Sequence, residues 1–121
     1  PHSLAGSETS RMATRWLYHV RLRGEGADLA RYTPDAFARE GFVHASYAPS
    51  VLESARLYFP PGAALELLQI DPRRLDVPVV EVETPRGPMP HVRGTIPRDA
   101  ITSIVPLVDL EGSAPPEHLD V

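Results

Sequence analysis

Apolar and polar residues alternate along several short segments of the chain, which is the pattern of β-strands that bury one face. Glycine, proline and aspartate separate these segments, and with 14 prolines in the chain many strands should be brief or lie at sheet edges. The alternation predicts strands over about Arg15–Leu22, Phe42–Tyr47, Leu65–Ile70, Val77–Glu83, Pro90–Gly94 and Ile101–Leu110.

Helical signals occur only in the N-terminal half. Thr33 followed by Pro34 is typical of an N-cap and a first helical residue, and Gly41 is placed to end that helix. A second helix begins near Ser50, which has capping-box spacing with Glu53. Its predicted core stripe consists of Val51, Ala55, Tyr58 and Phe59. The order of elements predicts an α+β fold, a compact single domain with two short N-terminal helices packed on a split, mostly antiparallel β-sheet.

The length of 121 residues fits one domain, but the two ends differ in composition from the rest. Residues 1–11 have no periodicity and are predicted to be an expression-tag remnant, with Met12 as the native start. Residues 12–110 form the predicted domain. Residues 111–121 are rich in proline, glycine and acids and are expected to be a flexible tail.

Composition excludes several classes of function. The chain has no cysteine, which excludes disulfides and thiolate chemistry, and no lysine, which excludes Schiff-base chemistry. A net charge of -4 disfavours binding to duplex nucleic acid. No apolar run of about 18 residues and no signal-peptide core precedes the first strand, so neither membrane insertion nor secretion is expected. The expected location is therefore the cytoplasm.

Three histidines lie in predicted strands, where alternate residues point to the same face. Each shares its face with a polar residue. The pairs are His19 with Arg21, His44 with Ser46, and His91 with Arg93. Imidazole, guanidinium and hydroxyl groups all donate hydrogen bonds, so a cleft lined by these faces would bind phosphate or carboxylate. Tyr47, at the end of the second strand, is a further candidate for stacking on a ligand base.

Other interpretations of these residues remain open. Three neutral imidazoles can bind zinc, but the chain has no His-x-His or His-x-x-x-His spacing and nearby arginines oppose a cation, so no metal is expected. Ser46 activated by His44 is a second alternative, without a Gly-x-Ser-x-Gly elbow to support it. Each histidine taken alone is equally consistent with a core residue bonded to backbone.

The order of these motifs resembles the DUF952 family, a small bacterial family of domains of unknown function. The resemblance covers about Arg15 to Pro106. It rests on Tyr18-His19-Val20, Gly41-Phe42-Val43-His44-Ala45-Ser46, Leu67-Leu68-Gln69-Ile70-Asp71 and Pro90-His91-Val92-Arg93-Gly94, followed by Pro97 and Ala100-Ile101. It implies a fold similar to the ADP-ribosyltransferase superfamily, related in style to the RNA 2'-phosphotransferases, in which a split sheet grips NAD. The family usually has Cys where this chain has Ala45, and often Tyr where it has Arg93.

The resemblance also implies roles for individual residues. With it, the catalytic candidates are His44, His91 and Glu81; the candidates for holding NAD or a related nucleotide are His19 from the resemblance together with Arg21, Ser46, Tyr47 and Arg93 from the strand positions. Glu83 shares the strand face of Glu81 and is an equal candidate for the site acid. The expected function is that of an ADP-ribosyltransferase-like enzyme that binds NAD or a related phosphorylated nucleotide in a cleft lined by histidine and arginine. The alternative is a non-NAD enzyme or a non-catalytic module that binds a small anionic metabolite on the same scaffold.

Overall fold

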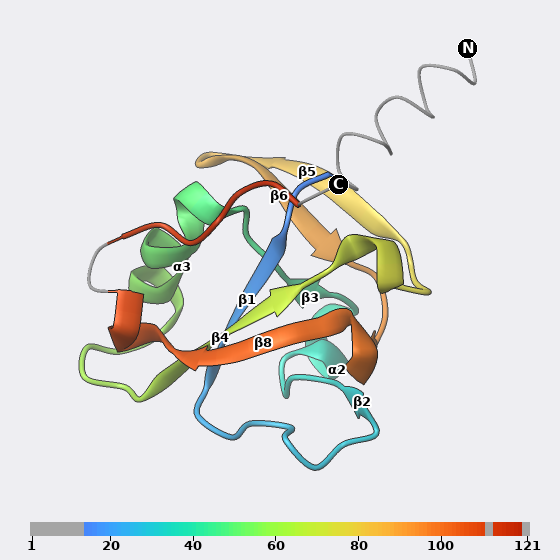
Figure 1. Cartoon of the computed structure of the whole chain (residues 1–121), viewed down its shortest axis with the longest axis horizontal. Coiled ribbons are helices and arrows are strands. Elements are labelled where there is room, and N and C mark those ends of the chain that lie inside the picture. The colour runs from blue at the N-terminus through green and yellow to red at the C-terminus, as the bar shows by residue number, and fades with distance from the viewer. Residues whose placement is uncertain (1–13, 111–112, 120–121) are drawn as a thin grey trace.

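The main sheet has three antiparallel strands, β1 (Leu17–Leu22), β4 (Leu65–Ile70) and β8 (Ile101–Pro106), in the order β1-β4-β8. The computed structural model describes residues 14–110 and 113–119, so the predicted tag remnant, residues 1–11, and Met12 lie outside the described residues. β1 crosses the centre of the molecule between β4 and the helical side (Figure 1). β1 therefore contacts both the rest of the main sheet and the helical side of the molecule.

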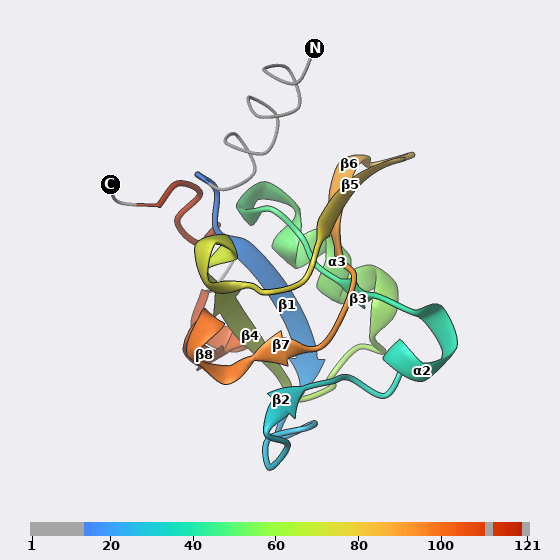
Figure 2. The same cartoon turned by 90° about the vertical axis from the view of Figure 1, so that its right-hand side faces the viewer.

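A second sheet lies beside the first and consists of β3 (Val43–His44), β6 (Gly87–Val92) and β5 (Val79–Thr84), with β6 in the middle. The short strands β2 (Arg31–Tyr32) and β7 (Ile96–Pro97) form a separate ladder. A backbone bridge between Tyr18 and Ser46 joins the two larger sheets, with N–O distances of 2.8 and 2.7 Å. The pairings between the strands named here are all antiparallel, and Figure 2 shows the β5–β6 hairpin projecting next to the helix α3.

The predicted α+β class is confirmed. The helices are shorter than the sequence predicts. Within the described residues the α-helices are α2 (Phe37–Glu40), a single turn, and α3 (Val51–Tyr58). Short 3-10 turns complete the set over Ala48–Ser50, Pro72–Arg74, Arg98–Ala100 and Leu107–Leu110. Predicted strand ends also shift, since β8 stops at Pro106, whose missing N–H cannot extend a ladder.

One predicted N-cap is wrong, and the other, Ser50, lies at the N-cap position of α3 as predicted. α2 begins after Ala36 because the Thr33 hydroxyl donates to the Arg31 carbonyl instead of capping a helix. Ser50 makes no side-chain cap bond, and Glu53 forms an ion pair with Arg86 in place of a capping box. The predicted core stripe of α3 also fails at its end, since Tyr58 is 55% exposed.

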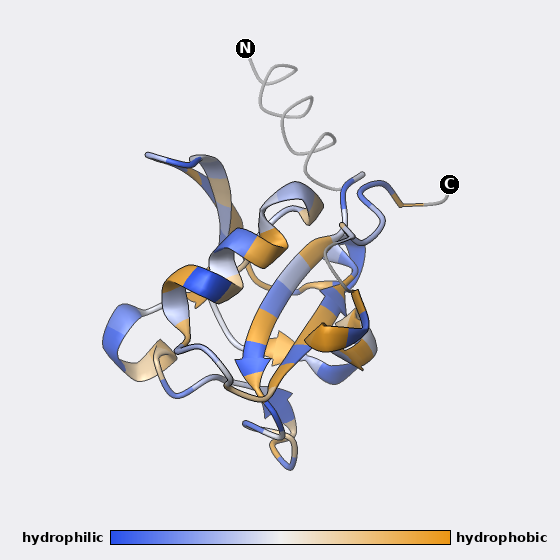
Figure 3. Ribbon diagram, turned by 90° about the vertical axis from the view of Figure 1, so that its left-hand side faces the viewer, coloured by the Kyte–Doolittle hydropathy of each residue, from blue (hydrophilic) through white to orange (hydrophobic). Residues whose placement is uncertain are grey.

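The hydrophobic core consists of two clusters on opposite faces of β1. Leu17 packs in one cluster with residues such as Val43 and Val92, and Tyr18 packs in the other with Val51 and partly buried neighbours such as Trp16. Successive strand residues point to opposite faces, which is why adjacent residues of β1 serve different clusters. Figure 3 shows the same alternation as orange and blue segments along the strands.

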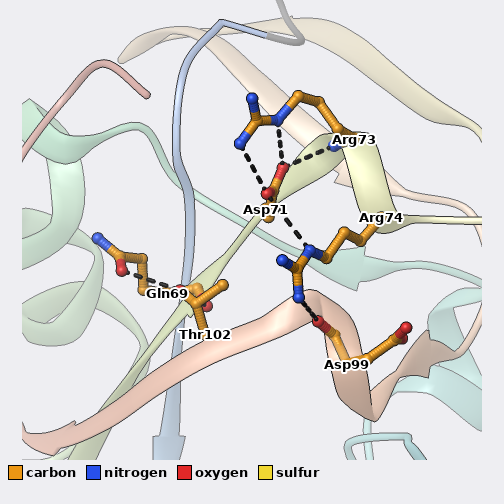
Figure 4. Close-up of polar contacts among 6 residues, drawn as sticks. All are labelled: Gln69, Asp71, Arg73, Arg74, Asp99 and Thr102. Atoms are coloured by element: carbon orange, nitrogen blue, oxygen red, sulfur yellow. Dashed lines mark hydrogen bonds and ion pairs between the residues drawn. The ribbon is translucent and has the colours of Figure 1, made fainter. Parts of the chain in front are cut away.

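A buried carboxylate holds the end of β4. Asp71 is 3% exposed, accepts a hydrogen bond from the backbone N–H of Arg73, and pairs with the Arg73 guanidinium at 3.0 Å. Arg74 lies 3.7 Å from the same carboxylate and donates to the carbonyl of Asp99 (Figure 4). Chiefly because of the Arg73 side-chain bond, the pKa of Asp71 lies below its ordinary value. The link fixes the turn after β4 against the turn before β8.

Residues 113–119, within the segment expected to be a flexible tail, lie along the start of β1. Trp16 N–H donates to the carbonyl of Glu117, and Leu119 N–H donates to the carbonyl of Thr14, both at 2.9 Å. The Tyr18 hydroxyl donates to the Pro116 carbonyl. Figure 1 shows this segment next to the N-terminal end of β1, which it covers.

Candidate functional site

A pocket of about 890 Å³ opens between the second sheet and the helices α2 and α3. His19, His44, Ser46 and His91 all line it, so four of the residues predicted from strand phase converge on one space. The remaining wall is mixed in character, with the aromatic side chains of Phe42, Tyr58 and Phe59 and the charged groups of Glu25, Asp35, Arg39, Glu40 and Arg86. Among the helices that the structure describes, none is long and apolar enough to cross a membrane.

His19 is buried at the back of the pocket, and both of its ring nitrogens are occupied. Its Nδ1 lies 2.6 Å from the carbonyl oxygen of His44, which can only accept, so Nδ1 carries the proton. Burial lowers the pKa of His19 to about 4, so the ring is neutral at pH 7 and Nε2 is an acceptor. The hydroxyl of buried Tyr32 donates to that nitrogen at 2.8 Å. His19 therefore positions the backbone of β3, and neither nitrogen is free for a ligand.

His44 is half exposed and is held by a carboxylate. Its Nε2 lies 2.7 Å from Oε2 of Glu40. The two residues meet because Gly41, with φ of 78°, ends α2 and turns the chain into β3. A carboxylate on one imidazole nitrogen fixes the orientation of the ring, which suits His44 to contact a ligand through its other nitrogen, Nδ1.

His91 faces His44 across the antiparallel pair of β3 and β6, with ring centroids 5.5 Å apart. Its ring stacks on Phe42 at 3.9 Å. Desolvation and then the charges of His44 and Arg93 lower the pKa of His91 below the ordinary value. Within the described part of the chain, neither ring nitrogen of His91 has a hydrogen-bond partner, so this neutral imidazole is available to a ligand.

Ser46 is buried at 6% exposure and bonded within the protein. Its hydroxyl lies 2.7 Å from that of Ser54 on α3, and Arg86 donates to the Ser54 hydroxyl at 3.1 Å. Among the described residues, no hydrogen bond joins the Ser46 hydroxyl to an imidazole, so these contacts lend no support to a serine nucleophile. The hydroxyls instead connect the segment that follows β3 with α3 and the β5–β6 hairpin.

The two predicted arginines do not line the pocket. Arg21 is 4% exposed and is held by the Glu66 carboxylate at 3.0 Å and the Glu25 carbonyl at 2.9 Å. β6 ends at Val92, so the strand phase that relates Arg93 to His91 no longer applies, and the Arg93 guanidinium lies 5.9 Å from the Phe42 ring centroid. Arg21 does share a face of β1 with His19, since both contact Tyr32, but it does not reach the pocket.

Tyr47 and Glu81 form a separate contact away from the histidines. The Tyr47 hydroxyl donates to Oε1 of Glu81 at 2.6 Å, and burial raises the pKa of Tyr47. Glu81 pairs with Pro90, one residue before His91, so Glu81 and His91 point to opposite faces of the second sheet. Glu83 shares the Glu81 face. The structure does not bring either acid together with the three histidines.

The pocket also contains residues that strand phase could not identify. Glu40 is four residues before His44, a spacing that becomes a contact only through the turn at Gly41. Arg86 lies in a hairpin turn, where a side chain has no strand face, and Tyr58 is assigned to the core by helical periodicity. Within residues 14–110 and 113–119, no group of three His, Asp or Glu side chains is placed to hold a metal ion.

Two crystal structures are similar to this one. They are those of protein CC0527 from Caulobacter crescentus and of a double mutant of the same protein, with TM-scores of 0.68 and 0.67 and sequence identities of 20% and 19%. Each comparison covers 79% of this chain and 96% of the other, so the fold is shared. No curated protein matches the chain. The family model described as protein of unknown function DUF952 matches residues 23–104, and the chain therefore belongs to the DUF952 family.

Proposed function

We propose that the pocket binds NAD or a related phosphorylated nucleotide and that the chain is an enzyme of the ADP-ribosyltransferase type. The observation that carries this proposal is the convergence of His19, His44 and His91 on one pocket. A volume of about 890 Å³ falls in the usual range for small-molecule and cofactor sites. The proposal includes a relationship of the fold to the ADP-ribosyltransferase superfamily.

The aromatic and polar walls suit the two parts of a nucleotide. Phe42 and Tyr58 offer ring faces near the imidazoles, with Tyr58 5.4 Å from His44 between ring centroids, and such faces stack on a planar base. Ribose hydroxyls need donors and acceptors, which the free nitrogens of His91 provide. The pocket residues therefore fit the chemical groups of the proposed ligand.

Each histidine has a distinct part in the proposed mechanism. NAD, when bound, supplies the ADP-ribosyl group. His19 holds the backbone of His44 in place, Glu40 orients the His44 ring by accepting from Nε2, and Nδ1 of His44 accepts from a ribose hydroxyl. His91, neutral through its lowered pKa, accepts a proton from the attacking group. Catalysis in this proposal rests on positioning of the substrate and on electrostatic stabilisation, since the sequence contains no cysteine or lysine nucleophile.

The acidic groups of the pocket favour a second candidate function. Glu25, Asp35 and Glu40 offset the charges of Arg39 and Arg86, so the pocket as a whole is not strongly cationic. A smaller ligand with one anionic group and an apolar part would meet less repulsion than a pyrophosphate. The second candidate is thus a non-NAD enzyme, or a non-catalytic module, for a small anionic metabolite.

Calorimetry with NAD, ADP-ribose and ADP tests the proposal. We expect saturable binding that His91→Ala weakens about 10-fold or more, because a hydrogen bond to a ligand group is lost inside the pocket. Glu81→Gln, on the opposite face of the sheet, is the matched control and should bind as wild type. Nicotinamide release that disappears in His44→Ala tests turnover. Absence of binding at millimolar nucleotide would rule out the nucleotide and leave the second candidate.

A further inference from the structure

Arg86 lies at the tip of the β5–β6 hairpin, in a turn of defined geometry. Thr84 and Gly87 pair across the turn, and the Thr84 hydroxyl donates to the carbonyl of Gly87 at 2.7 Å. The backbone N–H of Arg86 donates to the same hydroxyl at 3.1 Å. Figure 2 shows the hairpin projecting next to α3, and the Arg86 side chain reaches Glu53 and Ser54 on that helix.

The Arg86 guanidinium is partly buried and bonded on one side only. Its side chain is 17% exposed and lines the pocket. Nη1 donates to Oε1 of Glu53 at 3.0 Å and to the hydroxyl of Ser54 at 3.1 Å, which uses both of its hydrogens. Among the residues that the structure describes, Nε and Nη2 have no hydrogen-bond partner. These two atoms form the edge of a guanidinium that binds two oxygens at once.

We infer that Arg86 holds the anionic oxygens of the pocket's ligand, a phosphate or carboxylate group, through its Nε and Nη2 edge. Glu53 is 56% exposed and supplies only one oxygen, so it orients the guanidinium without neutralising the free edge by a two-point contact. A partly desolvated arginine with an unoccupied edge in a pocket is suited to an oxyanion.

The distances place this anion site within reach of the histidines. The Arg86 guanidinium carbon lies 5.8 Å from the centroid of the Tyr58 ring, and that ring lies 5.4 Å from His44. His44 in turn lies 5.5 Å from His91. Tyr58 therefore bridges the two sites, and a ligand that contacts the imidazoles and stacks on Tyr58 carries its anionic group at Arg86. This inference rests on the proposed function for the presence of an anionic ligand, and it adds the residue that selects for the anion.

Nuclear magnetic resonance of the full chain tests the inference with pyrophosphate, inorganic phosphate and ADP as probes. We expect the Arg86 Nε–H resonance to shift saturably, and Arg86→Gln to weaken binding about 10-fold to 100-fold, because charged hydrogen bonds to the anion are lost. Arg39→Gln is the matched control, since Arg39 also lines the pocket but is 76% exposed, and its change should stay below about 3-fold.

Glu53→Gln is a second variant, which should strengthen pyrophosphate binding where Arg86→Gln weakens it. Gln keeps an oxygen that can accept from Nη1, and the loss of the negative charge of Glu53 beside the guanidinium should tighten pyrophosphate binding about 2-fold to 5-fold. An unshifted Arg86 resonance overturns the inference, as does unchanged affinity in both variants. Should Arg86→Gln fail to fold, the absence of tightening in Glu53→Gln overturns it alone.

The two proposals fail in different ways. Binding of pyrophosphate through Arg86, without binding of NAD or ADP-ribose, supports the anion site and contradicts the nucleotide. NAD binding of equal strength in wild type and Arg86→Gln supports the nucleotide and contradicts the anion site. Inorganic phosphate compared with acetate at equal concentration distinguishes a phosphate-bearing ligand from a carboxylate.

Discussion

The carbonyl of His44 and the hydroxyl of Tyr32 together determine the state of His19. The carbonyl requires a proton on Nδ1, and the hydroxyl satisfies Nε2 as an acceptor. Because the ring is only 7% exposed, protonation would leave a charge without solvent or a carboxylate partner. One neutral imidazole thus ties β1 and β2 to the pocket strand β3, which is a structural role for a residue that resembles a ligand-binding one.

This role predicts how stability depends on pH. The pKa of His19 is lowered from 6.5 to about 4 in the folded chain, so between these values the unfolded chain binds more protons and the folded state loses stability as pH falls. The difference corresponds to about 3 kcal/mol at pH 4. Urea denaturation from pH 7 to pH 4 should show this loss in wild type. His19→Gln should be less stable than wild type at pH 7, and its free energy of unfolding should fall less between pH 7 and pH 4.

His118→Gln is the control for that measurement, because the His118 side chain is 68% exposed and lies outside the pocket. Its denaturation profile should follow wild type throughout the pH range. An equal dependence on pH in wild type and His19→Gln would show that other groups cause the loss of stability.

At the scale of the element, hydrophobic alternation predicts strands where the strand is long enough to repeat. Leu65–Ile70 is correct to the residue because this apolar-rich run follows the turn at Gly62 and ends at the turn residues Asp71-Pro72. The ladder of β2 and β7 has two residues in each strand, so no period exists to detect. Single-turn α2 likewise depends on Gly41 and on tertiary contacts more than on its own sequence.

Strand phase likewise identifies site residues only where they lie within a strand. Phase correctly places His44 and Ser46 on one face, and it relates His91 to His44 through the β3–β6 pair. It fails for Arg93, which lies beyond the end of β6, and for Arg86, which lies in a turn. Tyr58 is misassigned because helical periodicity cannot distinguish a core from a pocket wall.

The turn after β4 provides a prediction at this scale. Asp71→Asn should lower the free energy of unfolding by about 1 to 3 kcal/mol, because a buried carboxylate loses charged hydrogen bonds to Arg73. The lowered pKa of Asp71 means that the difference from wild type is present above pH 3.8 and declines as pH falls below it. Chemical denaturation at pH 7 and pH 3 measures both effects.

Asp76→Asn is the matched control for the turn. Asp76 also pairs with an arginine, Arg31, at 2.6 Å, but its side chain is 60% exposed and solvent screens the pair. The loss of stability should therefore be much smaller than for Asp71→Asn. Losses of equal size would mean that burial of Asp71 does not strengthen its contacts.

At the scale of the whole molecule, β1 is the common wall of the two core clusters, and the segment 113–119 covers its start. A substitution in β1 and a substitution in the segment 113–119 should therefore affect stability differently. A terminal segment can detach while the sheets stay folded, so the cost of a substitution there cannot exceed the free energy of detachment. A residue of β1 that packs in a core cluster cannot detach in this way, so its substitution acts on the whole sheet.

Leu119 and Leu17 make this difference measurable, since they are 6% and 0% exposed. Leu17→Ala should cost about 2 to 5 kcal/mol, the usual range for a buried leucine in a core. Leu119→Ala should cost about 1 to 2 kcal/mol and should raise hydrogen exchange at the amides of Trp16 and Leu119, which cross between the two segments. Amides of β4 should keep wild-type protection in Leu119→Ala and lose it in Leu17→Ala. If Leu119→Ala instead exposed β4, the segment 113–119 would unfold together with both sheets, and β1 would depend on it for its place between the two clusters.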